Sequence, residues 1–282
     1  MKKFFLALLL AALLASVAFA NPISVGNMNV YNFDDIKLHA YSTGDNMNDH
    51  CYVLETLEGL VLIESTAYKE NIKALSDYIK SLDKPLVAAL LSYHPNGYKS
   101  YGDDLKIYAT ENALKSWAEG GSVWNLTQSF IQALGDKVAE DLPSEAEIIN
   151  EGETLKLAGV EFKILHSSDG EDYDIEIPAI NAIYRHMMGS KTHNILPAVP
   201  YIEAEIANLK NYQEKSYTMI LTSHAAPEGQ KAVAEKIEYL EKVLELAKTS
   251  ANKEEFINAV KTAFPDYSVD AYLEMSANAL FN

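Results

Sequence analysis

Histidine side chains come directly after several apolar runs of this sequence. His94, His166 and His224 each follow such a run, and His186 and His193 lie close together in one segment between His166 and His224. Imidazole is the commonest metal-binding side chain, and three or four converging imidazoles suit zinc or another borderline divalent ion. A single histidine of this kind is more often an ordinary loop residue. The number of them at successive strand ends predicts a metal site, because α/β folds place their sites there.

The elements that would position these histidines alternate between strand and helix patterns in both halves of the chain. Strand patterns cover residues 37–41, 50–55, 59–63, 86–91, 106–109, 148–164, 174–183 and 217–222. Helical patterns cover residues 68–82, 111–118, 124–142, 201–210, 229–248, 253–263 and 269–279. This alternation predicts an α/β domain in which helices cover sheets. The last helices, over about 229–282, form a C-terminal extension that is either an outer layer or a surface for homo-oligomer formation.

The N-terminus has the three zones of a bacterial secretory signal peptide. Lys2 and Lys3 precede an almost wholly apolar run over residues 4–17, and Ala18 and Ala20 supply a cleavage-like small-x-small pattern. We therefore expect residues 1–20 to be removed and residues 21–282 to form a single domain in the periplasm or outside the cell. A membrane anchor is the alternative, but the run is short for a span. No integral membrane span is expected after cleavage.

The net charge and the cysteine content limit which partners the protein can bind and whether disulfide bonds can stabilise it. The formal net charge of −17 argues against binding to nucleic acid or to anionic membrane surfaces, both of which repel an acidic protein. Cys51 is the only cysteine, so the exported chain has no internal disulfide and must rely on its core. Its apolar surroundings predict a buried strand residue. A small molecule is the expected ligand or substrate.

Five segments, in order, give the sequence a resemblance to the metallo-β-lactamase-fold superfamily. Residues 61–64 resemble the strand that ends on an Asp, and residues 92–102 stand where the His-x-His-x-Asp-His motif is found. Residues 165–167, 188–190 and 222–224 resemble the middle His site, the Gly-Asp of the bridging carboxylate and the last His site. The resemblance covers most of the chain. It implies an αββα sandwich, here with extra C-terminal helices.

The first metal-binding motif departs from the family pattern. When Pro95 is aligned with the motif's variable proline, His94 survives as the second His, while Ser92, Asn96 and Gly97 replace the first His, the Asp and the last His. A neutral Asn does not accept a proton usefully near pH 7. Ser190 stands near the place of the bridging Asp. We therefore do not expect the family's two-zinc site.

The resemblance instead implies one atypical metal site. His94, His166 and His224 would supply one ligand from each segment, and His193 or His186 would complete a rearranged site. One zinc or other divalent transition metal would polarise a carbonyl and lower the pKa of water. The expected function is hydrolysis of an ester, lactone or amide bond by an exported protein. The alternative is a non-catalytic binding or interaction protein that has lost the metal.

Three residues near the histidines are candidates for a catalytic role. Asn96 retains hydrogen-bonding capacity at the motif's Asp position, and Tyr93 is a candidate donor to a substrate oxygen. Asp169, with Glu171 and Asp172, is a candidate general base, although a solvated acidic loop is the alternative interpretation of this run.

Overall fold

A computed structural model of the chain describes residues 23–25, 27–45, 48–168 and 170–281. The predicted signal peptide at residues 1–20 and the candidate base Asp169 therefore lie outside the described residues.

The first half of the chain forms an eight-stranded sheet whose strands stand side by side in sequence order. The strands are β1 (Ile23–Val25), β2 (Met28–Phe33), β3 (Ile36–Ser42), β4 (His50–Glu55), β5 (Leu60–Ile63), β6 (Leu86–Leu90), β7 (Ile107–Ala109) and β8 (Glu147–Ile148). Strands β1 to β5 pair antiparallel, and β5 to β8 pair parallel. Helix α1 (Lys69–Ser81) makes the crossover between β5 and β6 that a parallel pair requires.

The second half forms a five-stranded sheet in the order β13-β12-β11-β10-β9. Its strands are β9 (Thr154–Leu157), β10 (Val160–His166), β11 (Tyr173–Ile177), β12 (Ala182–Tyr184) and β13 (Met219–Leu221). Strands β9 to β12 are antiparallel, whereas β12 and β13 are parallel because helix α4 (Val199–Lys215) connects them. Because β12 and β13 are parallel, their C-terminal ends lie side by side at the same end of the sheet.

Strand β4 shows how side-chain alternation builds the layers. Tyr52 and Leu54 point into the core between the two sheets, whereas Cys51 and Val53 point into the core under the helices. All four are fully buried, since successive side chains of a strand face opposite sides of the sheet. The burial of Cys51 agrees with its predicted place in the core.

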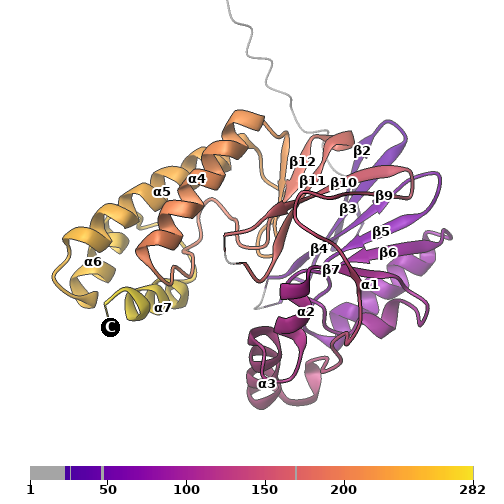
Figure 1. The fold of residues 1–282 in the computed structure, drawn as a ribbon, viewed down its shortest axis with the longest axis horizontal. Helices are drawn as coiled ribbons and strands as arrows, with labels where there is room; N and C mark the ends of the chain where they lie inside the picture. The colour runs from indigo at the N-terminus through magenta and orange to yellow at the C-terminus, as the bar shows by residue number, and fades with distance from the viewer. Residues whose placement is uncertain (1–22, 26, 46–47, 169, 282) are drawn as a thin grey trace, which may run out of the picture.

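Helices cover the outer face of each sheet, as Figure 1 shows. Helices α1, α2 (Glu111–Trp117) and α3 (Ser122–Leu134) lie beside the first sheet, and α4 and α5 (Gln230–Thr249) lie beside the second. Helices α6 (Lys253–Ala263) and α7 (Asp270–Leu280) extend the α4–α5 layer. The αββα sandwich with C-terminal helices, expected from the sequence, is confirmed.

Several predicted elements have different bounds in the structure, and two of them have a clear physical reason. The helix expected over residues 124–142 ends at Leu134, because Gly135 adopts a φ of +68° that stops an α-helix. The strand expected over residues 174–183 is divided at Pro178, which begins a short 3₁₀ turn between β11 and β12. This division lets the chain reverse and bring the end of β12 toward the first sheet's loops.

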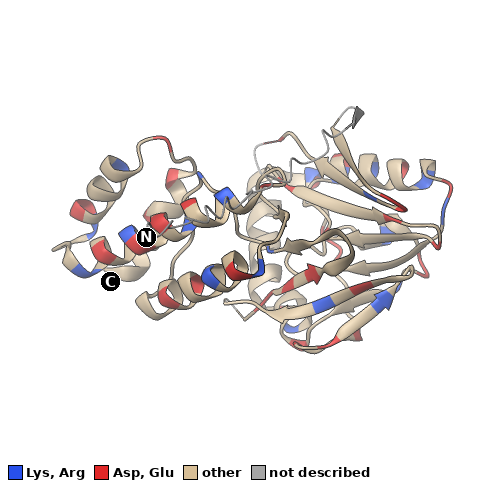
Figure 2. Ribbon diagram, turned by 90° about the horizontal axis from the view of Figure 1, so that it is seen from above, with Lys and Arg blue, Asp and Glu red and all other residues tan. Residues whose placement is uncertain are grey.

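No helix among the described residues is long and apolar enough to cross a membrane. Figure 2 shows acidic positions on both the sheets and the helices, with basic positions among them.

Candidate metal centre

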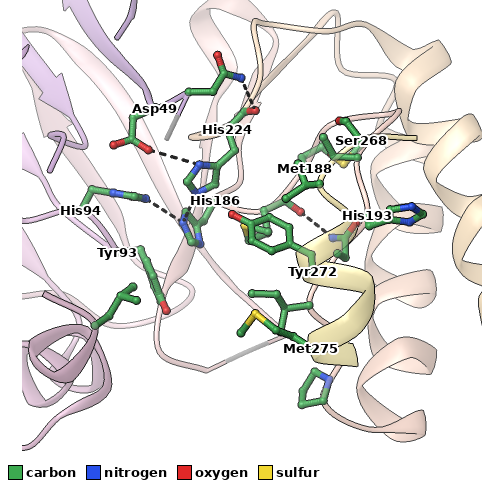
Figure 3. A pocket seen from close by; sticks show the side chains of 18 of the residues that line it. Asp49, Tyr93, His94, His186, Met188, His193, His224, Ser268, Tyr272 and Met275 are labelled. Carbon is green, nitrogen blue, oxygen red and sulfur yellow. Dashed lines mark hydrogen bonds and ion pairs between the residues drawn. The ribbon is translucent and has the colours of Figure 1, made fainter. Parts of the chain in front are cut away.

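Three imidazoles from three loops converge between the two sheets. The Nε2 atoms of His94 and His186 lie 3.0 Å apart, and those of His224 and His186 lie 3.1 Å apart. One ligand atom from each of the three histidines falls within 4.8 Å of the others. Figure 3 shows the three rings turned toward one another at one end of a cavity. We call these residues the three-histidine cluster.

The backbone of His94 is positioned by a buried glutamate at the end of β5. Glu64 accepts hydrogen bonds from the backbone N–H groups of Ser92, Tyr93 and His94, at 2.8, 3.2 and 2.7 Å. Burial raises the pKa of Glu64 to about 7, although these three bonds act to lower it. Glu64 itself has a φ of +62°, which turns the chain sharply after the strand. The carboxylate therefore fixes the loop that carries His94.

His186 and His224 follow the parallel strands β12 and β13. Thr222 connects the two segments, because its hydroxyl donates to the carbonyl of His186 at 2.7 Å and accepts from the N–H of Met188 at 3.0 Å. The N–H of Ser223 donates to the same His186 carbonyl at 3.1 Å. Parallel pairing thus delivers two of the three imidazoles to one edge of the sheet.

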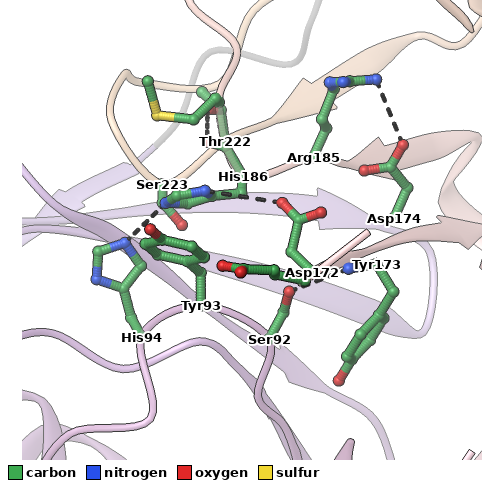
Figure 4. A network of polar contacts seen from close by, with 12 residues as sticks. Ser92, Tyr93, His94, Asp172, Tyr173, Asp174, Arg185, His186, Thr222 and Ser223 are labelled. Atoms are coloured by element: carbon green, nitrogen blue, oxygen red, sulfur yellow. Dashed lines mark hydrogen bonds and ion pairs between the residues drawn. The ribbon is translucent and has the colours of Figure 1, made fainter. Parts of the chain in front are cut away.

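Buried carboxylates face the outer nitrogens of two of these imidazoles. Asp172 Oδ2 lies 3.7 Å from His186 Nδ1, and Asp49 Oδ1 lies 3.5 Å from His224 Nδ1. Figure 4 shows the Asp172–His186 pair beside the Ser92–Tyr93 loop, with the Tyr93 ring stacked on His186 at 4.1 Å between centroids. A carboxylate at Nδ1 favours the tautomer whose Nε2 lone pair points into the cluster.

Burial favours the uncharged form of His94 and His186. It lowers the pKa of His94 to about 4, and burial together with the neighbouring histidines lowers the pKa of His186 well below its ordinary value. Burial also raises the pKa of Asp49 to about 6. Neutral imidazole is the form that binds a metal ion.

The donor set fits a divalent metal. Two nitrogens bound to one tetrahedral zinc at about 2.05 Å lie about 3.3 Å apart, close to the 3.0 and 3.1 Å that separate His186 Nε2 from the Nε2 atoms of His94 and His224. Three nitrogen ligands on rigid strand ends, with carboxylates behind two of them, match the composition of zinc sites that keep a position open for another ligand. His94, His186 and His224 are therefore the residues that would hold one ion.

Two of the predicted ligands lie outside the cluster. His166, expected beside His94 and His224, ends β10 with a side chain 65% exposed, and its Nδ1 lies 3.0 Å from Glu151 Oε1. The expectation that it joins them is corrected: His186 takes that place, because β12 rather than β10 ends next to the Ser92–His94 loop. His193 lines the cavity, but its Nδ1 pairs with the Tyr239 hydroxyl at 3.0 Å.

The candidate catalytic residues also have distinct positions. The amide of Asn96 is buried and donates to Ala139 O at 2.8 Å and Thr127 Oγ1 at 3.2 Å, so it holds a loop and does not face the cluster. The catalytic role expected for Asn96 is corrected on this ground. Tyr93 does line the cavity. Asp49 and Glu64 were not expected as the carboxylates that position the histidines, although the Asp49-His50 pair before β4 was a visible signal.

A cavity of about 620 Å³ opens from the cluster toward the C-terminal helices. Tyr93, His94, His186 and His224 line one end, and Met275 lines the other. This volume is in the range of small-molecule sites.

Comparison of the sequence with models of protein families and with curated proteins finds no match. Solved structures do match. A beta-lactamase domain protein from Burkholderia ambifaria has a TM-score of 0.66 and 13% identity over 93% of this chain and 90% of its own. A metallo-beta-lactamase family protein from Thermus thermophilus has a TM-score of 0.62 and 11% identity, over 87% of this chain and 91% of its own. The sec-alkylsulfatase Pisa1 from Pseudomonas sp. has a TM-score of 0.55 and 15% identity, over 92% of this chain and 49% of its own. With its two sheets, its covering helices and its site between the sheets, the chain has the metallo-β-lactamase fold that its sequence resembles.

Proposed function

We propose that this chain is an exported metal-dependent hydrolase that acts on an ester, lactone or amide bond through one divalent ion. The observation that carries the proposal is the convergence of the Nε2 atoms of His94, His186 and His224 at one end of a cavity. Similarity to metallo-β-lactamase-fold structures, among them an alkylsulfatase, supports hydrolysis as the reaction class. Fold similarity alone does not select a substrate.

The reaction adds water across an acyl bond. The hydroxyl of water joins the acyl carbon, the bond from that carbon to the alcohol oxygen or amine nitrogen breaks, and the second hydrogen of water goes to the leaving alcohol or amine. A bound divalent ion supplies Lewis-acid polarisation and lowers the pKa of water. Tyr93, which is stacked on His186 and lines the cavity, would donate its hydroxyl to the carbonyl oxygen. Asp172 and Asp49, 3.7 and 3.5 Å from the Nδ1 atoms of His186 and His224, would orient these two imidazoles.

Metal analysis of the untagged, mildly purified protein tests the proposal. We expect about one equivalent of zinc, iron or manganese per chain. His94→Ala, His186→Ala and His224→Ala should each lose it, whereas His166→Ala, at the exposed end of β10, should keep it. Metal content near zero in the wild-type protein, with no rise in melting temperature on adding zinc, iron or manganese, would reject the proposal.

A non-catalytic binding protein on the same fold is the second candidate, and Asn96 is the observation that favours it. Asn96 stands at the position of the motif's Asp and has no carboxylate. Its amide donates to Thr127 and Ala139 and therefore does not face the cluster. The two candidates differ in their response to substitution: a binding protein keeps its ligand after His186→Ala and His224→Ala, whereas a hydrolase loses turnover.

Export is the part of the proposal that rests on the N-terminal sequence. Lys2 and Lys3 before an apolar run, and Ala18-Phe19-Ala20 after it, support cleavage near residue 20. N-terminal sequencing of the protein recovered from the periplasm or medium should begin near Asn21. Recovery of the uncleaved chain in the membrane fraction would reject this part.

A further inference from the structure

The cavity beside the three-histidine cluster has an unusual concentration of exposed apolar side chains. Among the described residues, six large hydrophobic side chains are exposed, and four of these line this one cavity. The four are Leu126, Ile195, Val269 and Met275. Met275 is 51% exposed and Val269 is 41% exposed. Met275 and Ser268, the residue before Val269, lie across the cavity from His94 in Figure 3, and we call Val269 and Met275 the apolar end. Clustered exposed apolar groups mark binding sites, whereas scattered ones need no explanation.

The apolar end is built from segments that the fold holds firmly. The segment after His186 is attached to α7, because the N–H of His193 donates to the Ser268 carbonyl at 3.0 Å and the N–H of Ser268 donates to the Lys191 carbonyl at 2.9 Å. Deeper in, the hydroxyl of Ser276 donates to the Asn194 carbonyl at 2.8 Å. These bonds fix α7 opposite the cluster, so the apolar end is a formed wall of the cavity. Figure 3 shows Tyr272 and Met275 of α7 across the cavity from His94.

Val269 keeps its place at a conformational cost. It has a φ of +64° and stands immediately before α7 without a side-chain cap hydrogen bond. A left-handed conformation is a genuine outlier for a β-branched residue, and Asn or Asp would suit it better. The chain thus presents an exposed, strained valine to the cavity where a polar residue would fold more easily.

The charged residues that line the cavity indicate which charge its ligand can carry. Among the described residues that line it, Asp49 and Glu171 are acidic and none is Lys or Arg. Sulfate, phosphate and carboxylate groups are bound in proteins chiefly by arginine and lysine. The lining therefore disfavours an anionic ligand, including an alkyl sulfate of the kind named for the Pisa1 neighbour.

We propose that the cavity binds an uncharged ester or lactone with an apolar chain, its carbonyl at the three-histidine cluster and its chain against Met275 and Val269. This substrate class rests on the proposed hydrolase function. The apolar end would remove the chain from water, and each buried methylene would strengthen binding about threefold to fourfold.

Turnover of a graded ester series tests the proposal. With zinc-loaded protein, kcat/KM for 4-nitrophenyl octanoate should exceed that for the butanoate at least tenfold. Met275→Asp should reduce this ratio at least fivefold. Leu57→Asp, at an exposed turn that does not line the cavity, should leave the ratio unchanged. Val269→Asn should also reduce the ratio without lowering the melting temperature, which separates the loss from misfolding. An equal kcat/KM for all chain lengths in an active enzyme would overturn the proposal.

Binding without turnover separates this inference from the proposed function. Calorimetry should show that the protein binds N-octylacetamide, an uncharged probe, at least tenfold more tightly than octyl sulfate. Met275→Asp should weaken the binding of N-octylacetamide. If no ester is cleaved but this pattern is found, the hydrolase function fails and the cavity's preference stands. Octyl sulfate binding as tightly as N-octylacetamide would overturn the inference whatever the activity.

Discussion

The two ends of the cavity are built in opposite ways. At the cluster, polar groups are buried behind the histidines: Glu64 accepts three backbone N–H groups, and Asp49 and Asp172 face imidazole nitrogens. At the apolar end, Val269 and Met275 are exposed hydrophobic side chains. Buried polar groups and exposed clustered apolar groups are both costly for folding alone. This contrast agrees with the two proposals, which assign the chemistry to the three-histidine cluster and the recognition of an apolar chain to the apolar end.

Removing an imidazole of the three-histidine cluster should have the largest effect on activity. It should leave the apolar end unchanged. For His186→Ala we expect kcat/KM for 4-nitrophenyl butanoate to fall at least a hundredfold, because loss of a ligand costs more than loss of a group behind it. Steady-state assays at saturating zinc measure this, with His166→Ala as the matched control. Wild-type activity of the His186→Ala protein would contradict the assignment of the reaction to the three-histidine cluster.

The wall that joins the two ends depends on a buried lysine. Lys236 of α5 donates to the Thr192 carbonyl at 2.6 Å and to Asn194 Oδ1 at 2.7 Å. Burial lowers its pKa to about 7 from an ordinary value near 10.5. Between these pH values the unfolded chain binds a proton that the folded chain does not, so this group makes stability rise with pH.

Lys236→Met should therefore remove this part of the pH dependence of stability. The difference in unfolding free energy between wild type and Lys236→Met should shift in favour of the wild type by about 1.4 kcal/mol per pH unit above pH 7. Urea unfolding at about pH 7.5 and 9 measures it. A difference that stays constant over this interval would show that the folded protein keeps Lys236 charged.

Glu64→Gln should sharpen the account of the chemical end. A glutamine presents one NH₂ group where the carboxylate accepts only, so one of the Ser92–His94 N–H bonds is lost. We expect zinc affinity to fall about tenfold, because His94 is no longer held in position. Competition with a chelator measures the affinity. Glu58→Gln, at an exposed position of the neighbouring turn, should bind zinc as the wild type does, and an unchanged affinity in Glu64→Gln would contradict this role.

The smallest effect is expected at the apolar end, where the substitution should stabilise the protein and not impair it. Val269→Asn should raise the unfolding free energy by about 1 kcal/mol, because asparagine tolerates the left-handed conformation that strains valine. Thermal unfolding should show the gain. A destabilised Val269→Asn protein would mean that the valine is retained for packing and not for the ligand.

Much of the fold was predictable because its strands are buried on both faces. Residues 59–63 and 86–91 are continuous apolar runs, typical of strands between covering layers, and they became β5 and β6. The end of α3 was not predicted correctly, since the apolar pattern continues past Gly135. The C-terminal helices were expected from their spacing, but not their contact with the cavity.

The site was predictable in part. His94 and His224 follow buried strands, and the structure brings both into the three-histidine cluster. His166 also follows a strand, but the strand order puts β11 between β10 and β12, and that order depends on long-range pairing that no local pattern encodes. His186 was named only as a substitute for a lost carboxylate. Asp49 acts through His224 and carries no motif of its own, whereas Glu64 ends the 61–64 landmark, from which its bonds to the Ser92–His94 backbone were not predicted.

Anomalous diffraction from crystals grown with zinc tests the central claim most directly. Data collected above and below the zinc absorption edge should give one strong anomalous peak within about 2.1 Å of the Nε2 atoms of His94, His186 and His224, and the peak should vanish in His186→Ala. A peak at His166 or His193 instead, or no peak at the three-histidine cluster in zinc-soaked crystals, would contradict the account.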